Sequence, residues 1–349
     1  MKKLKRSEVM PYLKEYNEQE IFYQKYQQRK REKTLQFFLK NYNKNDLMHK
    51  QVYVEEFLLT GHKEFEKEEV MWSDQQKDIE IRKYNRFMPQ LFAIHDFFEM
   101  IYVLENEMHL EVEEDKMSLE VGDIVLIPPD TIHRPIVMEN TIAIQVIIRK
   151  STFQKVFYKL LNGNNVISEF FLNALYIKDV KNILIFNCQQ DKDVLNCLLQ
   201  LFQEDYNQLP GNRIVVNNLF EILLCLLLRF NLIHMKVSQK RQPYDKRAIQ
   251  ILQYIQEYSE YVTIKEVAKT FNLSESYLSK YIIRKIGKSF SELRQEIRME
   301  KACEMLRGSN LQVADIALFV GYENVEHFIR LFKKKYEQTP NQYRKNIQK

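Results

Sequence analysis

Long apolar segments are missing from this chain of 349 residues. The longest uninterrupted apolar run, residues 222–228, is far shorter than the roughly 20 residues that a helix needs to cross a bilayer. No apolar stretch follows the basic start Met1-Lys2-Lys3, because Glu8 and Glu15 occur there instead, so no secretory signal peptide is predicted. These absences argue against a membrane protein, and we expect a cytoplasmic location.

Cysteine is scarce as well. The four cysteines, Cys188, Cys197, Cys225 and Cys303, form no C-x-x-C pair. In a reducing compartment such isolated cysteines behave as small buried apolar residues. A cysteine-based metal or redox site is therefore not expected.

The charges are unevenly distributed, although the net charge is only +5. Residues 244–349 contain 19 basic and 13 acidic residues, whereas the remaining 243 residues contain 33 and 34. The positive excess therefore belongs to the C-terminal third, which indicates a polyanionic partner for that part. Many solvated helical surfaces are equally basic, so this pattern does not decide the function by itself.

The hydrophobic pattern divides the chain into parts, as expected for a length that exceeds one ordinary domain. Residues 1–50 are polar with apolar residues at loose helical spacing, which predicts a helical N-terminal extension. In residues 51–150 short apolar or alternating runs are separated by breakers such as Gly122 and Pro128. Short strands at this spacing predict an antiparallel sandwich or barrel. The expected strands include 52–54, 100–104, 109–112, 123–127 and 142–148.

Helical spacing returns in residues 151–236, which we expect to form a dimerisation or linking region. One helix is predicted over 193–207 and a second over 216–234. The second is apolar almost all round and needs two partners. Two interpretations stay open: burial within its own domain, or a dimer interface. A linker at 237–243 should lead into a helical domain at 244–349.

Two segments near the C-terminus, residues 263–282 and 313–332, are alike at an offset of 49 to 50 residues. The shared positions are a small residue in a short helix (Ala268, Ala317), a turn residue (Asn272, Gly321) and a capping residue (Ser274, Asn324). The alanine lets two helices cross closely, Asn or Gly tolerates a left-handed turn, and Ser or Asn accepts free N–H groups of the next helix.

This spacing predicts a helix-turn-helix, in which Leu278 and Ile282, or Phe328 and Phe332, hold the second helix on its partner. The outer face of that helix is then free to enter a major groove. One match would be weak evidence because helical hairpins are common. Two matches, joined by a helix predicted over 294–306, indicate a tandem DNA-binding unit.

Residues 246–344 resemble the AraC/XylS family of bacterial transcription regulators. The match is most specific at Asp315-Ile-Ala, at Val320-Gly-Tyr, and from His327-Phe-Ile-Arg-Leu-Phe through Thr339-Pro to Tyr343-Arg344. The resemblance implies two helix-turn-helix units bridged by a helix, which place recognition helices in successive major-groove segments of one site. Carried over position by position, the residues that face DNA are Ser276, Ser279, Lys280, Val325, Glu326 and Arg330.

The chemistry of these side chains agrees in part with the implied roles. Lys280 and Arg330 can donate to guanine or phosphate, and Glu326 can accept from a cytosine amino group. A first-turn helix charge is an equally good interpretation of Glu326. Basic residues that we expect to hold the phosphate backbone are Arg284, Lys285, Lys288, Lys333, Lys334 and Lys335.

The chain departs from the family pattern at three positions. Ile282 and Tyr322 stand where Phe is usual, which is a tolerable core exchange. Glu337 stands where Gly is usual, and a non-glycine residue at a left-handed helix end costs roughly 1 kcal/mol.

The strand-rich region resembles the cupin-type sensor domain of the same family, through residues 95–104 and 122–133. The resemblance implies an α+β chain: an antiparallel β cupin-like barrel with flanking helices, followed by the all-α C-terminal domain. Cupin enzymes bind metal through three histidines and a glutamate, and here His95, Glu99 and His133 could provide three ligands, with Ala93 at the remaining histidine position. Cupin sensors of this family generally work without a metal, so we expect no metal and no other cofactor.

Small barrels can hold one small molecule, and the effector is expected to contact His95, Glu99, Tyr102 and His133. The resemblance implies as partners promoter DNA, an effector such as a sugar, a second copy of the chain, and RNA polymerase. Two rival hypotheses are a metal-dependent cupin enzyme fused to a DNA-binding domain, and a non-catalytic protein whose tandem helices bind protein.

Overall fold

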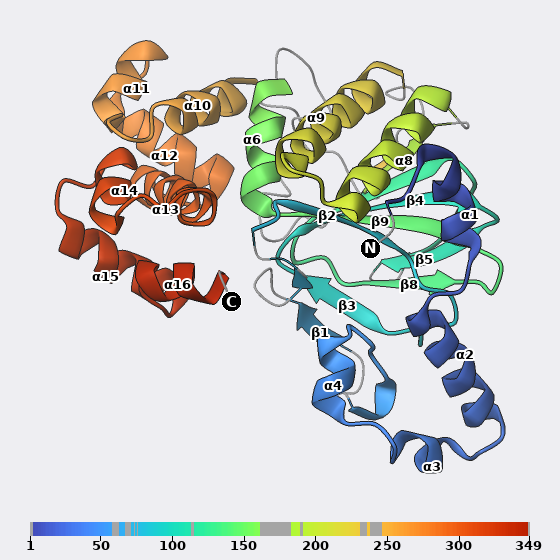
Figure 1. Ribbon diagram of the computed structural model, residues 1–349. Coiled ribbons are helices and arrows are strands. Elements are labelled where there is room, and N and C mark those ends of the chain that lie inside the picture. Colours follow the sequence, from blue (N-terminus) through green and yellow to red (C-terminus); the bar gives the residue numbers. More distant parts are fainter. Residues whose placement is uncertain are drawn as a thin grey trace. The chain divides into compact units, whose positions relative to one another are not determined.

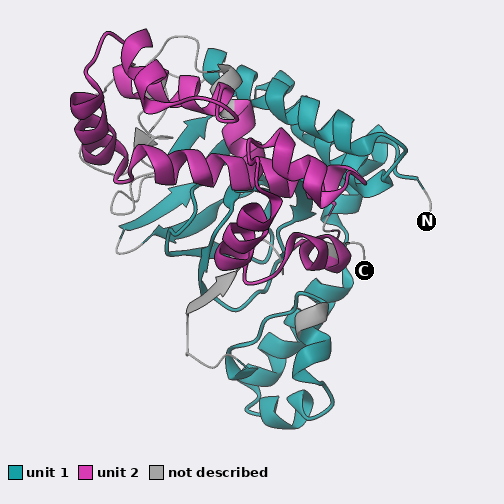
Figure 2. Cartoon of the chain, turned by 90° about the vertical axis from the view of Figure 1, so that its left-hand side faces the viewer, with its two compact units in different colours: residues 1–71, 78–150, 182–238 teal, residues 72–77, 151–181, 239–349 magenta. Residues whose placement is uncertain are grey.

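The computed structural model describes residues 3–57, 63–66, 71–72, 74, 76–112, 115–160, 183–188, 191–230, 236–237 and 246–347. The chain divides into two compact units, which Figure 2 colours separately. Unit 1 consists of residues 1–71, 78–150 and 182–238, and unit 2 of residues 72–77, 151–181 and 239–349. Of the linker expected at 237–243, only residue 237 lies within the described residues.

Unit 1 is built on two sheets, with the strand orders β1-β3-β8-β5-β6 and β11-β10-β7-β4-β9-β2. All neighbouring strands run antiparallel except β1 and β3, which are parallel. The strands are β1 (Lys63–Glu66), β2 (Ile79–Lys83), β3 (Phe92–His95), β4 (Phe98–Glu105), β5 (Met108–Val112), β6 (Asp115–Leu119), β7 (Asp123–Ile127), β8 (His133–Val137), β9 (Ile142–Ile148), β10 (Leu184–Asn187) and β11 (Lys236–Val237). This confirms the α+β class and the antiparallel character of the N-terminal part.

The core of unit 1 includes side chains from both sheets. Ile101 and Val103 of β4, Leu110 of β5 and Val125 of β7 are fully or almost fully buried in one cluster. β4 is buried on both of its faces, and Figure 1 shows the helices α8 and α9 beside the second sheet. The sheet therefore needs apolar residues on both sides, which explains why its strands read as continuous apolar runs.

Most of the expected strands are confirmed, but the one at 52–54 is wrong. Val52 and Val54 are buried in a cluster with Tyr23 and Tyr26 of the N-terminal helices, just before a 3-10 turn, η2 (Glu55–Phe57). A buried loop can show the same alternation of apolar residues as a strand. Here the alternation reflects packing against the N-terminal helices.

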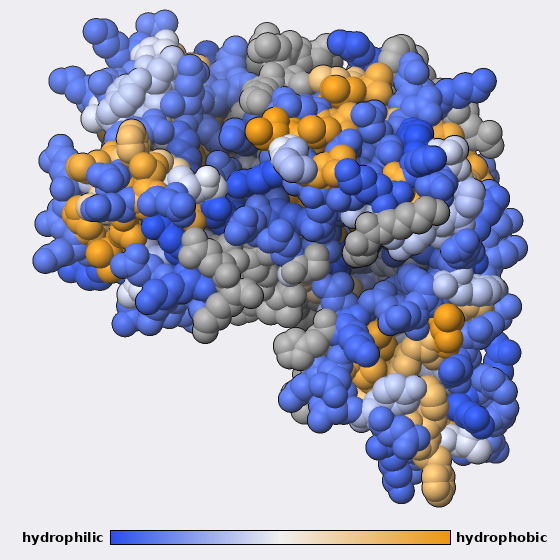
Figure 3. All heavy atoms as spheres, in the orientation of Figure 1, coloured by the Kyte–Doolittle hydropathy of each residue, from blue (hydrophilic) through white to orange (hydrophobic). Residues whose placement is uncertain are grey.

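The helices α8 (Lys192–Asn207) and α9 (Asn212–Phe230) match the two predicted helices closely. α9 buries Val216, Phe220 and Leu223. Its opposite side leaves Ile214 69% and Ile222 51% exposed, and Figure 3 shows apolar surface over this helix. One face of α9 is thus part of the unit's own core and the other is open. The end of the predicted helix, 231–234, lies outside the described residues.

The N-terminal extension is helical, as expected, and packs on the rest of unit 1. Its elements are η1 (Arg6–Glu8), α1 (Val9–Lys14), α2 (Glu18–Arg31), α3 (Leu35–Leu39) and α4 (Lys44–His49). The main polar anchor is Glu20, fully buried, which accepts hydrogen bonds from Arg86 Nε at 2.8 Å and Lys83 Nζ at 2.5 Å. Arg86 also lies over the Tyr16 ring, 4.1 Å from its centroid.

All regular secondary structure in the described residues of unit 2 is helical. Its elements are α6 (Lys150–Leu160, from residue 151 onward), α10 (Lys246–Glu257), α11 (Ile264–Thr270), α12 (Glu275–Ile286), α13 (Phe290–Gly308), α14 (Val313–Phe319), α15 (Val325–Tyr336) and α16 (Pro340–Ile347). The helix predicted over 294–306 is α13, which begins one turn earlier because Ser289 and Glu292 form a capping box. Among the helices of the described residues, none is both long and apolar enough to cross a membrane.

The buried contacts of Glu20 with Arg86 and Lys83 should stabilise the fold in a way that depends on pH. Burial alone would raise the pKa of Glu20, but the hydrogen bonds from Arg86 and Lys83 outweigh it and hold that pKa below the ordinary value of 4.5. Glu20→Gln leaves two buried cations without an anion, so the free energy of unfolding should fall by about 3 kcal/mol or more at pH 7. The deficit relative to wild type should shrink as the pH falls below about 4.5, because the lowered pKa stabilises the fold only while Glu20 is ionised.

Urea unfolding of the full-length protein at several pH values tests this expectation. The matched control is Glu18→Gln, two residues away and exposed. Equal effects of the two substitutions, or a deficit that does not depend on pH, would contradict the assigned role of Glu20.

Candidate DNA interface and sensor cavity

The first helix-turn-helix consists of α11 and α12. Thr263 caps α11 in a capping box with Glu266, and the buried Ala268 accepts a backbone hydrogen bond from Leu273 at 2.8 Å across the turn. Asn272 adopts φ 53°, the left-handed conformation that the turn needs. The Ser274 side chain then accepts the N–H of Tyr277 and starts α12.

The second helix-turn-helix, α14 and α15, repeats these contacts. Ala317 accepts the N–H of Tyr322 at 2.8 Å, and Asn324 accepts the N–H of His327 at 2.9 Å. Gly321 at the turn has φ 90°, and a Cβ there would lie 2.2 Å from the Glu260 carbonyl oxygen. Only glycine fits this position, because both the conformation and the space exclude a side chain.

The end of α10 is tied to α13 by three basic side chains. Arg298 donates from Nε to the Ser259 carbonyl at 2.7 Å and from Nη2 to the Glu260 carbonyl at 2.6 Å. Arg294 donates to the Val262 carbonyl at 2.7 Å, and Lys301 to the Gln256 carbonyl at 2.9 Å. Only Gln256 belongs to α10, whose last carbonyls have no partners within the helix. The other three carbonyls lie in the segment between α10 and α11, so these cations fix that segment on α13.

Arg298 also reaches the second helix-turn-helix. Its guanidinium lies over the ring of Tyr322, 5.2 Å from the centroid, and is only 8% exposed. Since Glu260 touches the site of Gly321 as well, one buried arginine fixes the first helical pair relative to the second. Arg298 was not among the predicted residues, although basic residues at 294, 298 and 301 follow one stripe of α13 and could have indicated it.

The outer faces of α12 and α15 are polar and open to solvent. Exposed residues at equivalent places include Ser276 and Glu326, Tyr277 and His327, Lys280 and Arg330, and Arg284 and Lys334. Lys333 is exposed as well, while Ser279 and Val325 are half-buried. Arg330 Nη2 lies 3.0 Å from His327 Nδ1. Tyr277 and His327 were not among the predicted residues, although each directly follows one that was, Ser276 or Glu326.

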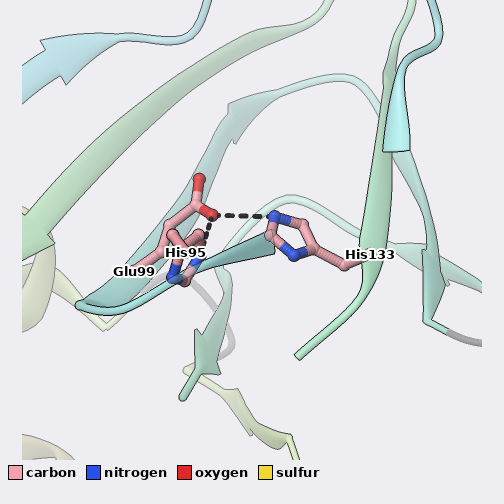
Figure 4. A group of neighbouring side chains, drawn as sticks. All are labelled: His95, Glu99 and His133. Carbon is pink, nitrogen blue, oxygen red and sulfur yellow. Dashed lines mark hydrogen bonds and ion pairs between the residues drawn. The ribbon is translucent and has the colours of Figure 1, made fainter. Parts of the chain in front are cut away.

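In unit 1, three predicted effector residues meet inside the β structure (Figure 4). His95 from β3, Glu99 from β4 and His133 from β8 are all at most 2% exposed. The Nε2 atoms of His95 and His133 lie 3.2 Å and 3.0 Å from the same Glu99 oxygen, Oε2. Gln145 of β9 donates to the other oxygen, Oε1, at 2.7 Å.

Electrostatics favours an ionised Glu99 and a neutral His95. Burial would raise the pKa of Glu99, but hydrogen bonds from His133 and His95 outweigh it and set that pKa well below the ordinary range. Burial lowers the pKa of His95 more than the neighbouring Glu99 raises it. Of the described residues, only this trio brings three such potential metal-ligating side chains together.

A cavity of about 630 Å³ opens beside this trio. Glu99, His133 and Gln145 line it from the sheets, and Tyr12, Tyr16 and Asn17 line it from the N-terminal extension. Tyr102 does not join them: it lies three residues from Glu99 on β4, and side chains an odd number of residues apart point to opposite faces. The contribution of the N-terminal extension to the cavity lining was not predicted, because nothing in the sequence pairs residues 12–17 with the strands.

Comparisons with known proteins address both units. Residues 267–346 match the family model described as "Helix-turn-helix domain". Residues 267–346 form an AraC-type helix-turn-helix domain. The chain is thus a DNA-binding transcription regulator.

Relatives extend beyond the AraC-type domain. An uncharacterised HTH-type transcriptional regulator of Haemophilus influenzae is 27% identical over 257 residues, covering 70% of this chain and 84% of that protein. The Msm operon regulatory protein of Streptococcus mutans is 22% identical over 259 residues, covering 73% and 87%. The C-terminal domain of AraT from Geobacillus stearothermophilus is a solved structure with 38% identity over 30% of this chain and 88% of its own, at a TM-score of 0.29.

The AraC-type domain contains a position where the chain can be stabilised. Glu337 ends α15 at φ 60°, as the sequence predicted, whereas the equivalent Gly287 ends α12 at φ 71°. Glu337→Gly should raise the free energy of unfolding by about 1 kcal/mol, because only glycine adopts this conformation without steric cost. Gly287→Ala, the reverse exchange at the equivalent position, is the control and should lower the free energy of unfolding by a similar amount. A lower stability of Glu337→Gly in urea unfolding would show that the left-handed end of α15 carries no steric cost.

The hydrogen bonds of Arg298 should contribute to both the stability and the DNA affinity of the AraC-type domain. Arg298→Leu keeps the apolar bulk but leaves two buried carbonyls unpaired, so the free energy of unfolding should fall by about 2–4 kcal/mol. Affinity for a site that spans two groove segments should fall too, because the two recognition helices are no longer held together. Urea unfolding and DNA titration measure the two effects, with Lys269→Ala on the exposed face of α11 as control. A stable variant with unchanged affinity would show that Arg298 does not hold the pair.

Proposed function

We propose that this regulator reads one DNA site through α12 and α15, and that a small molecule in the cavity of unit 1 modulates the binding. The observation that carries the proposal is the pair of open recognition faces fixed by Arg298. Lys280 and Arg330 stand at the centres of these faces. Each can donate to a guanine or a phosphate.

Neighbouring side chains complete the proposed interface. Glu326 is placed to accept from a cytosine amino group, and Ser276 and Ser279 to bond either a base or a phosphate. Val325 offers an apolar contact at the start of α15. The exposed cations Arg284, Lys333 and Lys334 lie further along the same helices and suit the phosphate backbone.

The effector part of the proposal rests on the cavity. Its volume of about 630 Å³ is within the range of small-molecule sites, roughly 300–1,000 Å³. Glu99 and His133 supply polar groups that line it, His95 contacts Glu99 from outside the lining, and tyrosines supply aromatic surface. A ligand that differs in affinity between two arrangements of the regulator would shift DNA binding by that difference. The resemblance to cupin-type sensors leads us to expect a sugar as the effector.

A homodimer is the proposed assembly. The open face of α9, with Ile214 and Ile222 exposed, supports it because large apolar side chains seldom gather on a free surface. A two-fold dimer would place two AraC-type domains on two repeated half-sites. Contact with RNA polymerase and a cytoplasmic location stay predictions. We propose a regulator and not an enzyme, in line with the regulatory roles named for its relatives.

The test begins with selection of bound sequences from a random DNA pool by the full-length protein. The selected site is then titrated at several salt concentrations. Arg330→Ala should cost about 1–3 kcal/mol of binding free energy and relax the preference at one base pair. Lys40→Ala is the charge-matched control, exposed in the N-terminal extension, and should bind as wild type does.

Two results would overturn the DNA-reading proposal. Unchanged affinity and preference of Arg330→Ala would contradict the assigned face of α15. An affinity that does not fall with salt would contradict phosphate contacts, which release counterions on binding, and would favour a protein partner for the tandem helices.

A further inference from the structure

His327 and Arg330 stand one turn apart on the outer face of α15, and their side chains meet. Arg330 Nη2 lies 3.0 Å from His327 Nδ1, and both residues are exposed. A guanidinium carries only N–H donors, so Arg330 donates this hydrogen bond and the imidazole accepts it. An imidazole accepts only when it is neutral, and it then has one N–H. The contact therefore fixes the tautomer of His327: Nδ1 is the acceptor, and Nε2 carries the hydrogen.

The ring of His327 is also supported from the turn that precedes α15. Its centroid lies 6.0 Å from that of Tyr322, with 55° between the ring planes. Tyr322 is buried and has the guanidinium of Arg298 over its ring. The Asn324 side chain accepts the backbone N–H of His327 at 2.9 Å, which fixes the backbone at this place. An exposed side chain that is already held in this way loses little conformational freedom when it binds a partner.

The pair offers hydrogen-bond donors to a partner and no acceptor. Arg330 keeps most of its N–H groups, because only one of them is directed at His327. The acceptor nitrogen of His327 is occupied by Arg330, and its Nε2–H has no partner among the described residues. A surface made of donors is matched only by a base edge that presents acceptors.

Base edges in the major groove differ in this respect. Guanine presents the acceptors N7 and O6, which suit the fork of an arginine. Thymine presents the acceptor O4, whereas adenine and cytosine each present an amino group that would face a donor. Residues three places apart on a helix are separated by roughly 4.5 Å along its axis, and stacked bases of one strand by about 3.4 Å. His327 and Arg330 therefore reach neighbouring base pairs.

We propose that His327 determines DNA specificity in two ways: it positions Arg330 against a guanine through Nδ1, and through Nε2–H it reads a guanine or thymine at the neighbouring base pair. The proposal rests on the proposed reading of DNA by α15, and it adds the bases that this helix selects.

The first recognition helix has no such pair in the described part of the chain. Tyr277 and Lys280 occupy the equivalent places of α12. The Tyr277 ring stacks on Tyr281 with 6.0 Å between centroids, and Lys280 makes no hydrogen bond or ion pair with a described residue. A lysine is a flexible point charge and not a planar fork. The sharper base preference is therefore expected in the DNA segment that α15 reads.

Three substitutions in the full-length protein separate the two roles of His327. His327→Asn keeps an acceptor at the place of Nδ1 and loses the donor, whereas His327→Gln keeps a donor near the place of Nε2 and loses the acceptor. His327→Phe loses both. Each variant selects from the same random DNA pool as wild type and is then titrated with the wild-type site. The matched control is His109→Asn, on β5 of unit 1, which should select and bind as wild type does.

Each variant has its own expected base preference. Wild type should select guanine at one base pair and guanine or thymine at the next. His327→Phe should lose both preferences and about tenfold or more in affinity, since a good base contact is worth roughly 5- to 150-fold. His327→Asn should keep the guanine and lose the second preference, and His327→Gln should do the reverse. Because His327 is exposed, urea unfolding should be the same for all variants.

A double-mutant cycle tests whether His327 positions Arg330. The loss of affinity in the double variant of His327→Phe and Arg330→Ala should be smaller than the product of the two single losses, because removal of either side chain already breaks the contact. Single losses that multiply would overturn the positioning role. Equal base preferences of His327→Asn and His327→Gln would overturn the division of roles between the two ring nitrogens.

Wild type separates this proposal from the proposed function. If wild type selects no sequence, or if its affinity does not fall with salt, the reading of DNA fails and this proposal fails with it. If wild type selects a sequence with salt-dependent affinity, and all three His327 variants select the same sequence and bind it as tightly, only the role of His327 is refuted.

Discussion

The arrangement of the two helix-turn-helix units depends on one buried arginine. Arg298 donates to two carbonyls in the turn after α10 and stacks on Tyr322 of the other helical pair. Buried backbone carbonyls need hydrogen-bond partners, and here the partners come from the bridging helix α13. The same contact packs the Glu260 carbonyl against Gly321, where no side chain fits. Two small helical pairs, each weakly constrained alone, are thereby held together as one unit.

Buried polar contacts organise unit 1 in a comparable way. Glu20 joins the N-terminal extension to Arg86 and Lys83, and Glu99 joins three strands through His95, His133 and Gln145. Because the extension lines the cavity, it belongs to the proposed effector site and is not a separate appendage. A ligand in the cavity would touch both the extension and the sheet.

The chain itself offers a direct route from the cavity to the AraC-type domain. Gln145 lines the cavity and bonds to Glu99 from β9, and α6 begins two residues after that strand ends. Within unit 2, the Ser151 hydroxyl of α6 accepts a hydrogen bond from Arg307 of α13 at 3.3 Å. Coupling along this route requires two arrangements of differing ligand affinity.

Features that neighbouring residues encode could be predicted from the sequence alone. Capping residues, the turn residues Asn272 and Gly321, and helical or alternating periodicity predicted both helix-turn-helix units, most strands and the left-handed end at Glu337. These features depend on contacts a few residues apart, so local chemistry is sufficient to place them.

Contacts between distant parts of the chain required the folded structure. The bonds of Arg298 to Ser259 and of Arg86 to Glu20 join residues 39 and 66 apart, and no local pattern pairs them. Packing also turned the apolar stretch at 52–54 into a loop and separated Tyr102 from Glu99 across the sheet. The trio of His95, Glu99 and His133 was foreseen as a group through a family resemblance. The contacts of the two rings with the Phe97 and Thr131 carbonyls, and of Glu99 with Gln145, became visible only in the folded structure.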